Sequence, residues 1–294
     1  MRRHWCSWML VGGLIVSLVA PGISADSKKD KKKIISAVKV DTTAEHIDVF
    51  EGIEQGLLEV KMIPKDSLGG NLLIENKGDK PLNVDFPAAF VGRQVLKQFG
   101  GGQQGGGFGG GGGQQGGQQG GGQAQGGGVG GGQQGGGGGF GGGGQQGGGG
   151  GGGFFSVPPD RVVRVAYRSV CLEHGKTEPA PRMNYTIAKV QDFRDDPLLE
   201  EVLKMVASGQ LDEQSAQAAT WHVTDKMSWE QLAAKSIPHI GRPATPYFTP
   251  QQIARAQSIF STAVARVNEH QENDKTATAS VKSDRSRSAT VKRD

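Results

Sequence analysis

A tract rich in glycine and glutamine, residues 100–153, divides the chain and limits what can fold around it. It holds most of the chain's 50 glycines and only isolated apolar residues, so it has almost nothing to bury. Glycine also loses more backbone entropy on ordering than any other residue. We therefore predict a disordered insertion at 100–153, which a folded domain tolerates because the entropy cost of loop closure grows slowly with length. Its chance G-x-G-x-x-G matches join no predicted strand to a helix, so they do not indicate a nucleotide site.

Short runs typical of β-strands flank this tract on both sides. They are rich in β-branched and aliphatic residues, and turn signals such as the stretch NKGD at 76–79 separate them. The runs lie at 57–63, 70–76, 80–86 and 89–96 before the tract, and at 160–175 and 183–190 after it. We predict that 46–99 and 154–190 together form one antiparallel β-sandwich, with the tract as an oversized loop between two strands.

From residue 196 onward the apolar residues recur with a helical period. Asp196 followed by Pro197 is typical of a helix start, and two capping boxes, S-x-x-Q at 228–231 and T-x-x-Q at 249–252, predict two more. A further helix is expected to begin near Asp212, and the last one to end near Asn268. We predict a helical subdomain over 191–271 and a disordered tail over 272–294, which makes the fold class α+β.

The first residues are typical of a secretory signal peptide. Arg2 and Arg3 precede an almost wholly apolar run at 8–20, and Ala25 provides a small residue before a cut that leaves Asp26 first. The apolar run is too short for a comfortable membrane span, which needs about 20 residues. We predict a signal peptide at 1–25 and a charged linker at 26–45, and therefore a secreted protein, extracellular or periplasmic, without a membrane span after cleavage.

The charge pattern argues against a nucleic-acid partner. The formal net charge is +4, and removal of Arg2 and Arg3 with the signal peptide brings it closer to balance. The basic clusters at 28–33 and 281–294 lack aromatic residues, so they are typical of solvated tails. The expected partner is an extracellular protein or a component of a cell surface or matrix.

The chain has two cysteines, and cleavage of the signal peptide removes Cys6, which leaves Cys171 without a disulfide partner. An unpaired cysteine is often an inert buried hydrophobe. Exported chains tend to avoid a loose thiol, however, which makes a chemically occupied Cys171 a second hypothesis. A nucleophile–base pair of Cys171 with His174 or His222 is a third, although no residue that would orient the histidine is apparent.

Metal sites and cofactors are not expected. The Cys-x-x-His spacing of Cys171 and His174 has no second half to complete a zinc site. Asp192, Asp195 and Asp196 resemble a calcium-ligand cluster, but a helix cap followed by a solvated loop explains them more economically.

A second motif, AQAATW at 216–221, lies in the helix that begins near Asp212. Together with Cys171 it resembles the thioester domains of bacterial surface adhesins. That resemblance implies an internal thioester between the Cys171 sulfur and the side-chain carbonyl of Gln217, formed with loss of ammonia. The bond would then acylate an amine or another nucleophile on a host or matrix partner, with Ala219 and Trp221 as packing positions.

The surrounding residues fit this chemistry. Gln217 and Trp221 lie one turn apart on one helix face, so the indole can exclude water from the bond. His174 and His222 are candidate proton carriers. The two motifs and the glycine-rich insertion also resemble uncharacterised exported proteins of planctomycete-type bacteria, which implies no function.

Three functions therefore remain open from the sequence. The leading hypothesis is a secreted, non-enzymatic surface or matrix interaction module that carries a Cys171–Gln217 thioester. The alternative is an exported structural or binding β-sandwich protein with an inert buried cysteine. The third is a Cys-His hydrolase.

Overall fold

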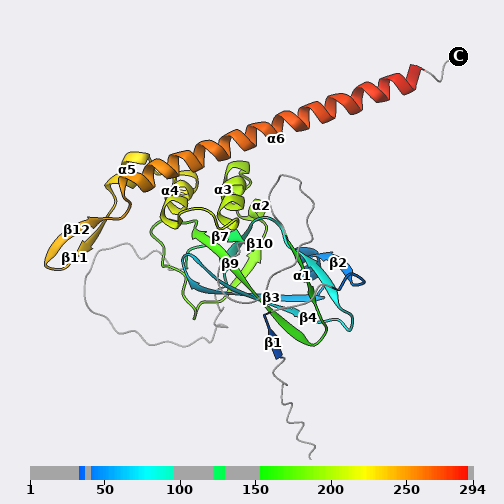
Figure 1. The fold of residues 1–294 in the computed structure, drawn as a ribbon, viewed down its shortest axis with the longest axis horizontal. Helices are drawn as coiled ribbons and strands as arrows, with labels where there is room; N and C mark the ends of the chain where they lie inside the picture. Colours follow the sequence, from blue (N-terminus) through cyan, green and yellow to red (C-terminus); the bar gives the residue numbers. More distant parts are fainter. Residues whose placement is uncertain (1–32, 37–40, 96–121, 130–152, 291–294) are drawn as a thin grey trace, which may run out of the picture. The chain divides into compact units, whose positions relative to one another are not determined.

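The structure is a computed structural model that describes residues 33–36, 41–95, 122–129 and 153–290 (Figure 1). The predicted signal peptide at 1–25 lies outside the described residues, as do parts of the predicted linker and most of the glycine-rich tract.

Six antiparallel strands close into a barrel-like sheet. The strands follow the order β9-β4-β3-β10-β6-β7, and β7 returns to pair with the last part of β9. A short strand, β1 (Lys33–Ile35), runs parallel to the first part of β9. The barrel strands are β3 (Leu58–Asp66), β4 (Gly69–Asn76), β6 (Phe90–Gln94), β7 (Gln125–Gly128), β9 (Arg161–Cys171) and β10 (Tyr185–Ala188).

A second, three-stranded sheet has the order β2-β5-β8. It consists of β2 (Glu45–Asp48), β5 (Leu82–Asp85) and β8 (Phe154–Val157). Asp48 caps the short helix α1 (Val49–Glu54) that follows β2, since its carboxylate accepts hydrogen bonds from the amides of Phe50 and Glu51.

Alternating side chains of the strands fill the main core. In β3 the buried residues are Leu58, Val60, Met62 and Pro64, with exposed or half-buried residues between them. In β9 the same alternation buries Val163 and Val165. Each fully buried aliphatic side chain contributes about 1.5–3 kcal/mol, so this alternation fixes which face of each strand turns inward.

The prediction of a β-sandwich is wrong, whereas the α+β class is confirmed. The difference is strand β7, which lies inside the predicted disordered insertion and joins β6 to β9. That prediction is therefore wrong for residues 122–129, and residues 100–121 and 130–152 of the tract lie outside the described residues.

Glycine suits β7 because its neighbours approach too closely for larger residues. A Cβ atom on Gly127 would overlap the backbone carbonyl of Arg168, and one on Gly126 would lie 2.6 Å from a methyl group of Leu203. The buried Gln125 side chain fixes the strand, because its amide donates to the Asp66 carbonyl and its oxygen accepts from the Tyr167 hydroxyl.

Four helices, α3 to α6, begin where the sequence predicts, whereas α1 and α2 were not predicted. Asp196 caps α3, Asp212 caps α4, and Ser228 with Gln231 forms the capping box of α5. Helices α3 and α4 pack against the outer face of the barrel at β7 and β9 (Figure 1). The helices are α2 (Val190–Phe193), α3 (Pro197–Ala207), α4 (Glu213–Thr224), α5 (Trp229–Ala234) and α6 (Pro250–Thr290).

Two features of the C-terminal region differ from the prediction. Helix α6 has 41 residues and continues to Thr290, so the predicted disordered tail is wrong for 272–290. No glycine or proline interrupts the chain between 251 and 290, so no residue of that stretch stops the helix. Between α5 and α6 an exposed hairpin, β11 (Ser236–His239) and β12 (Arg242–Pro246), replaces expected helix or loop.

Candidate functional site around Cys171 and Gln217

Cys171 is the last residue of β9 and is only 2% exposed. On one edge of the strand β7 runs alongside, with Gln125 opposite Cys171 and the Leu172 amide bonded to the Ala124 carbonyl. On the other edge, pairing with β4 ends at Arg168, and the Ser169 amide donates to the Leu68 carbonyl. Among the described residues, no strand therefore covers this second edge of the Cys171 main chain.

Helix α4 supplies the missing partner for that edge. Its residues Ala216, Ala218 and Ala219 are buried, and their small side chains let the helix approach the end of β9 closely. Gln217 is 5% exposed and points at the strand, because its side chain is bonded there.

The Gln217 side-chain amide pairs with the main chain of Cys171 through both of its polar atoms. The Cys171 amide donates to Gln217 Oε1 at 2.8 Å, and Gln217 Nε2 donates to the Cys171 carbonyl at 2.8 Å. This is the hydrogen-bond pattern of one further strand residue. The structure thus brings together the two residues that the sequence predicts as a pair, although 45 residues separate them along the chain.

The thiol of Cys171 lies in an apolar cluster. Its neighbours in that cluster include Ala218, Trp221, Leu232 and Phe248, all of them buried. Burial raises the pKa of the Cys171 thiol to about 12, and the negative charges of Glu178 and Asp66 act in the same direction. The thiol is therefore neutral at physiological pH and protected from water.

Trp221 lies against the other aromatic groups of this region. Its ring centroid is 4.7 Å from that of His174, 5.8 Å from Tyr247 and 6.0 Å from Phe248. The indole Nε1 is buried and has no hydrogen-bond partner among the described residues. The indole thus packs among His174, Tyr247 and Phe248, one helical turn after Gln217 on α4.

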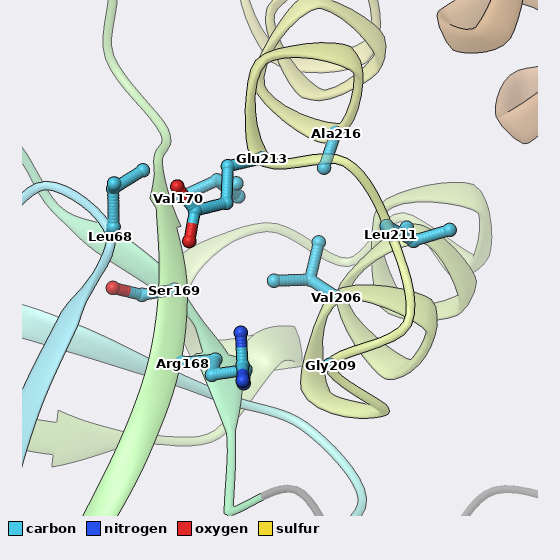
Figure 2. Close-up of a pocket in the computed structure, with 9 residues that line it drawn as sticks. All are labelled: Leu68, Arg168, Ser169, Val170, Val206, Gly209, Leu211, Glu213 and Ala216. Carbon is cyan, nitrogen blue, oxygen red and sulfur yellow. The ribbon is translucent and has the colours of Figure 1, made fainter. Parts of the chain in front are cut away.

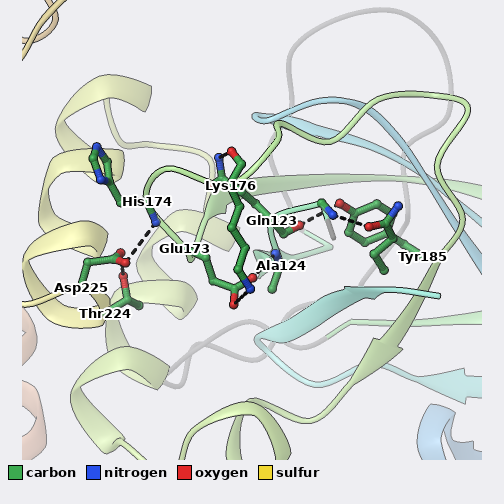
Figure 3. Close-up of polar contacts among 10 residues, drawn as sticks. Gln123, Ala124, Glu173, His174, Lys176, Tyr185, Thr224 and Asp225 are labelled. Carbon is green, nitrogen blue, oxygen red and sulfur yellow. Dashed lines mark hydrogen bonds and ion pairs between the residues drawn. The ribbon is translucent and has the colours of Figure 1, made fainter. Parts of the chain in front are cut away.

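The turn that follows Cys171 is held from two sides (Figure 3). The main-chain amide of His174 donates to an Asp225 oxygen at the end of α4. From the barrel side, the amide of Ala124 donates to the Glu173 carboxylate. The His174 ring packs edge-to-face on Trp221, and Lys235 Nζ lies 2.9 Å from its Nε2. Because an ammonium group can only donate, Nε2 is an acceptor and the imidazole is neutral.

Burial lowers the pKa of His174, and the charge of Lys235 lowers it further, against a smaller opposing effect of Asp225. His174 is therefore a weaker base than a free imidazole and is neutral at physiological pH. His222, in contrast, is not brought to Cys171 in the described contacts. Its ring stacks on Trp229 at 4.0 Å between centroids, and its Nδ1 lies 2.7 Å from the Met227 carbonyl.

Sequence reasoning missed Lys235 and Tyr247. Lys235 Nζ lies 5.5 Å from the Trp221 ring centroid and 4.8 Å from that of Tyr247. The Tyr247 amide donates to the Lys235 carbonyl, so the base of the β11–β12 hairpin holds the two residues together. No local motif marks either residue, because both reach the site only through packing.

A small pocket adjoins the site on the side of Val170 and Ala216 (Figure 2). Figure 2 shows Arg168 from β9 and Glu213 from α4 bordering it. Its volume of about 20 Å³ is enough for a single water molecule and too small for an organic cofactor. A second pocket of about 160 Å³ borders α1, α2 and α3 and shares no residue with the Cys171 cluster.

No group of three His, Cys, Asp or Glu side chains in the described part of the chain is arranged to hold a metal ion. Asp196, one of the acids considered as a calcium ligand, caps α3 by accepting from the amides of Leu198 and Leu199. None of the helices over the described residues is both long and apolar enough to cross a membrane.

Comparisons with known proteins do not assign the chain to a family. No protein-family model matches the chain, and no curated protein and no solved structure matches it either.

Proposed function

We propose that the protein is a secreted surface or matrix interaction module in which Cys171 and Gln217 form an internal thioester. The observation that carries the proposal is the double hydrogen bond between the Gln217 carboxamide and the main chain of Cys171. It keeps the acyl group beside the residue that bears the thiol, and such positioning makes an otherwise slow reaction between two groups effectively unimolecular.

Thioester formation would follow from this arrangement by balanced steps. The Cys171 sulfur attacks the side-chain carbonyl carbon of Gln217 and forms a C–S bond. The C–N bond breaks, and the nitrogen leaves as ammonia after taking up the thiol proton. The negative charge that develops on Gln217 Oε1 is stabilised by the Cys171 amide, which already donates to that oxygen at 2.8 Å.

The apolar surroundings support storage of such a bond. Trp221, Leu232 and Phe248 belong to the same buried apolar cluster as Cys171 and would keep water from an acyl group formed there. An amine of a partner would open the bond, with formation of an amide to the Gln217 acyl carbon and return of a proton to the sulfur. The partner class is therefore an amine-bearing extracellular protein or surface component.

A second candidate is an exported structural or binding protein in which Cys171 is inert. The raised pKa of about 12 favours it, because so little thiolate is available as nucleophile. In this case Gln217 is a structural residue that ties α4 to β9. A Cys-His hydrolase has less support, since His174 Nε2 faces Lys235.

Intact mass spectrometry separates these functions. A thioester makes the freshly purified protein lighter by the mass of one ammonia, and Cys171 then resists alkylation in denaturant until an amine such as methylamine opens the bond. Cys171→Ala and Gln217→Ala are expected to abolish the mass deficit. Gln214→Ala, on the same helix, is the matched control and retains it. A full sequence mass together with prompt alkylation in denaturant rules the thioester out and favours the inert cysteine.

A further inference from the structure

We propose that Trp221, Tyr247 and His174 form a binding site for a primary alkylammonium group, which Lys235 occupies in this structure. The inference deepens the proposed function and rests on it for the chemistry that follows binding, since it names the group that would be selected for reaction. The binding itself is independent of the thioester.

The contacts of Lys235 are those of an ammonium ion in an aromatic recess. Its Nζ lies 5.5 Å from the Trp221 centroid and 4.8 Å from the Tyr247 centroid, so both rings attract the cation. His174 Nε2 adds one hydrogen-bond acceptor at 2.9 Å. Two aromatic rings and one acceptor match a primary ammonium group, which keeps two further N–H donors for water or partner groups.

The position of His174 does not depend on Lys235. The ring packs edge-to-face on Trp221 at 4.7 Å, and the main-chain amide is bonded to Asp225. The acceptor atom therefore stays in place when another ammonium group takes the position of Lys235 Nζ.

Lys235 is well suited to being displaced. It is half-buried and lies at the boundary between α5 and the exposed β11–β12 hairpin, so its side chain can leave without opening the core. No carboxylate of the described residues forms an ion pair with it, so displacement breaks no salt bridge there. Lysine side chains have several rotatable bonds, which allows this exchange without movement of the main chain.

The recess adjoins the proposed thioester. Trp221 lies one helical turn after Gln217 on α4 and belongs to the same apolar cluster as Cys171. An ammonium group bound there must lose a proton before it can attack, and His174 Nε2 is the acceptor nearest to it. The nitrogen then bonds to the Gln217 acyl carbon, the C–S bond breaks, and His174 returns its proton to the sulfur. The nitrogen loses its second proton to water as the amide forms.

The test uses a Cys171→Ala chain, in which no thioester can form and binding is reversible. Lys235→Met in this background removes the competing ammonium group, and n-butylammonium chloride is titrated while the indole N–H resonance of Trp221 is followed by NMR. We expect binding at least about tenfold tighter than in the chain that keeps Lys235, because the internal competitor is gone. Lys235→Gln is a second variant in case the methionine disturbs the fold.

The controls separate ammonium recognition from apolar binding. Lys189→Met is the matched control, since Lys189 Nζ also lies over a ring, that of Phe50 at 5.6 Å, but without a second ring or a histidine. It should leave butylammonium binding unchanged. Adding Tyr247→Leu to Lys235→Met should remove the gain, and the neutral isostere 1-butanol should not bind in any variant.

The same titration is repeated with a second ligand, a lysine that is acetylated on its α-amino group and amidated at its carboxyl group. Binding of both ligands supports a general alkylammonium site, binding of the blocked lysine alone points to protein side chains, and binding of butylammonium alone points to small free amines. If folded Lys235→Met and Lys235→Gln chains bind neither ligand more tightly than their parent, the site does not exist. The mass of the chain with Cys171 intact tests the thioester separately, so the two proposals can fail independently.

Discussion

The two hydrogen bonds between the Gln217 side chain and the Cys171 main chain should contribute strongly to the stability of the fold. The substitution Gln217→Ala, which removes both, tests this expectation. The substitution removes both side-chain partners from the main-chain amide and carbonyl of Cys171, each bonded at 2.8 Å. A buried polar group left without a partner costs about 1–3 kcal/mol. Partial access of water to the small space left by the side chain reduces the sum, so we expect a loss of about 2–4 kcal/mol in the free energy of unfolding.

The measurement belongs in a Cys171→Ala background, where the main chain at 171 is kept and no thioester can form. Urea unfolding followed by tryptophan fluorescence reports on Trp221 and Trp229, which both lie in the helical region. Gln214→Ala is the control, because Gln214 Oε1 has no hydrogen-bond partner within the described residues. It should change the stability by less than about 0.5 kcal/mol.

Gln217→Glu provides a sharper version of the same test. A protonated carboxyl group can reproduce both hydrogen bonds, whereas a carboxylate cannot donate to the Cys171 carbonyl and is costly to bury. The stability of this variant should therefore fall as the pH rises from 4 to 7, relative to its parent. If Gln217→Ala and Gln214→Ala have the same small effect, the bond pair does not hold α4 to β9, and the geometric basis of the thioester proposal is lost.

Three further predictions concern the Cys171 thiol, the glycine-rich strand β7 and export of the protein. A free Cys171 thiol has its pKa raised from 9.0 to about 12, so its contribution to stability is present below pH 9 and is lost as the pH rises toward 12, by up to about 4 kcal/mol. Urea unfolding across this range should show the loss in the free-thiol chain and a smaller loss in Cys171→Ala; equal slopes would contradict the prediction. Gly127→Ala should destabilise the fold by about 3 kcal/mol or more, because the added methyl group meets the Arg168 carbonyl, whereas Gly153→Ala, with no atom within 4 Å of its Cβ position, should have little effect in the same assay. The protein recovered from the periplasm or medium should begin at Asp26 by N-terminal sequencing, and recovery of a chain that retains residues 1–25 would contradict export with cleavage.

The strands of the barrel and the starts of the helices were largely predictable, because local patterns decide them. The apolar alternation at 57–63 and 160–175 corresponds to β3 and β9. The caps at Asp196 and Asp212 and the capping box at Ser228 lie where the sequence predicts helix starts, since a side chain near each start satisfies free amides. Information within a few residues is sufficient for these elements.

Closure of the sheet was not predictable in the same way. β7 consists of Gln125 and three glycines, which carry no apolar alternation and have a low intrinsic preference for strands. The strand is ordered by groups far away in the chain, such as Asp66 and Tyr167, which bond the Gln125 side chain, and by the close approach of β9 to Gly127. Without β7, no strand joins β6 to β9, so a sequence in which the whole tract is taken as disordered predicts a sandwich rather than a closed, barrel-like sheet.

By itself, the sequence determined the α+β class and the positions of most barrel strands and most helices, because these depend on local periodicity and caps. The pairing of Cys171 with Gln217 was implied only by the resemblance of two short motifs to a known family. Only the tertiary structure decided that the Gln217 carboxamide completes the uncovered edge of β9 and that Lys235 and Tyr247 lie over Trp221. Those contacts join segments distant in the chain, and burial across several elements, rather than any local preference, selects them.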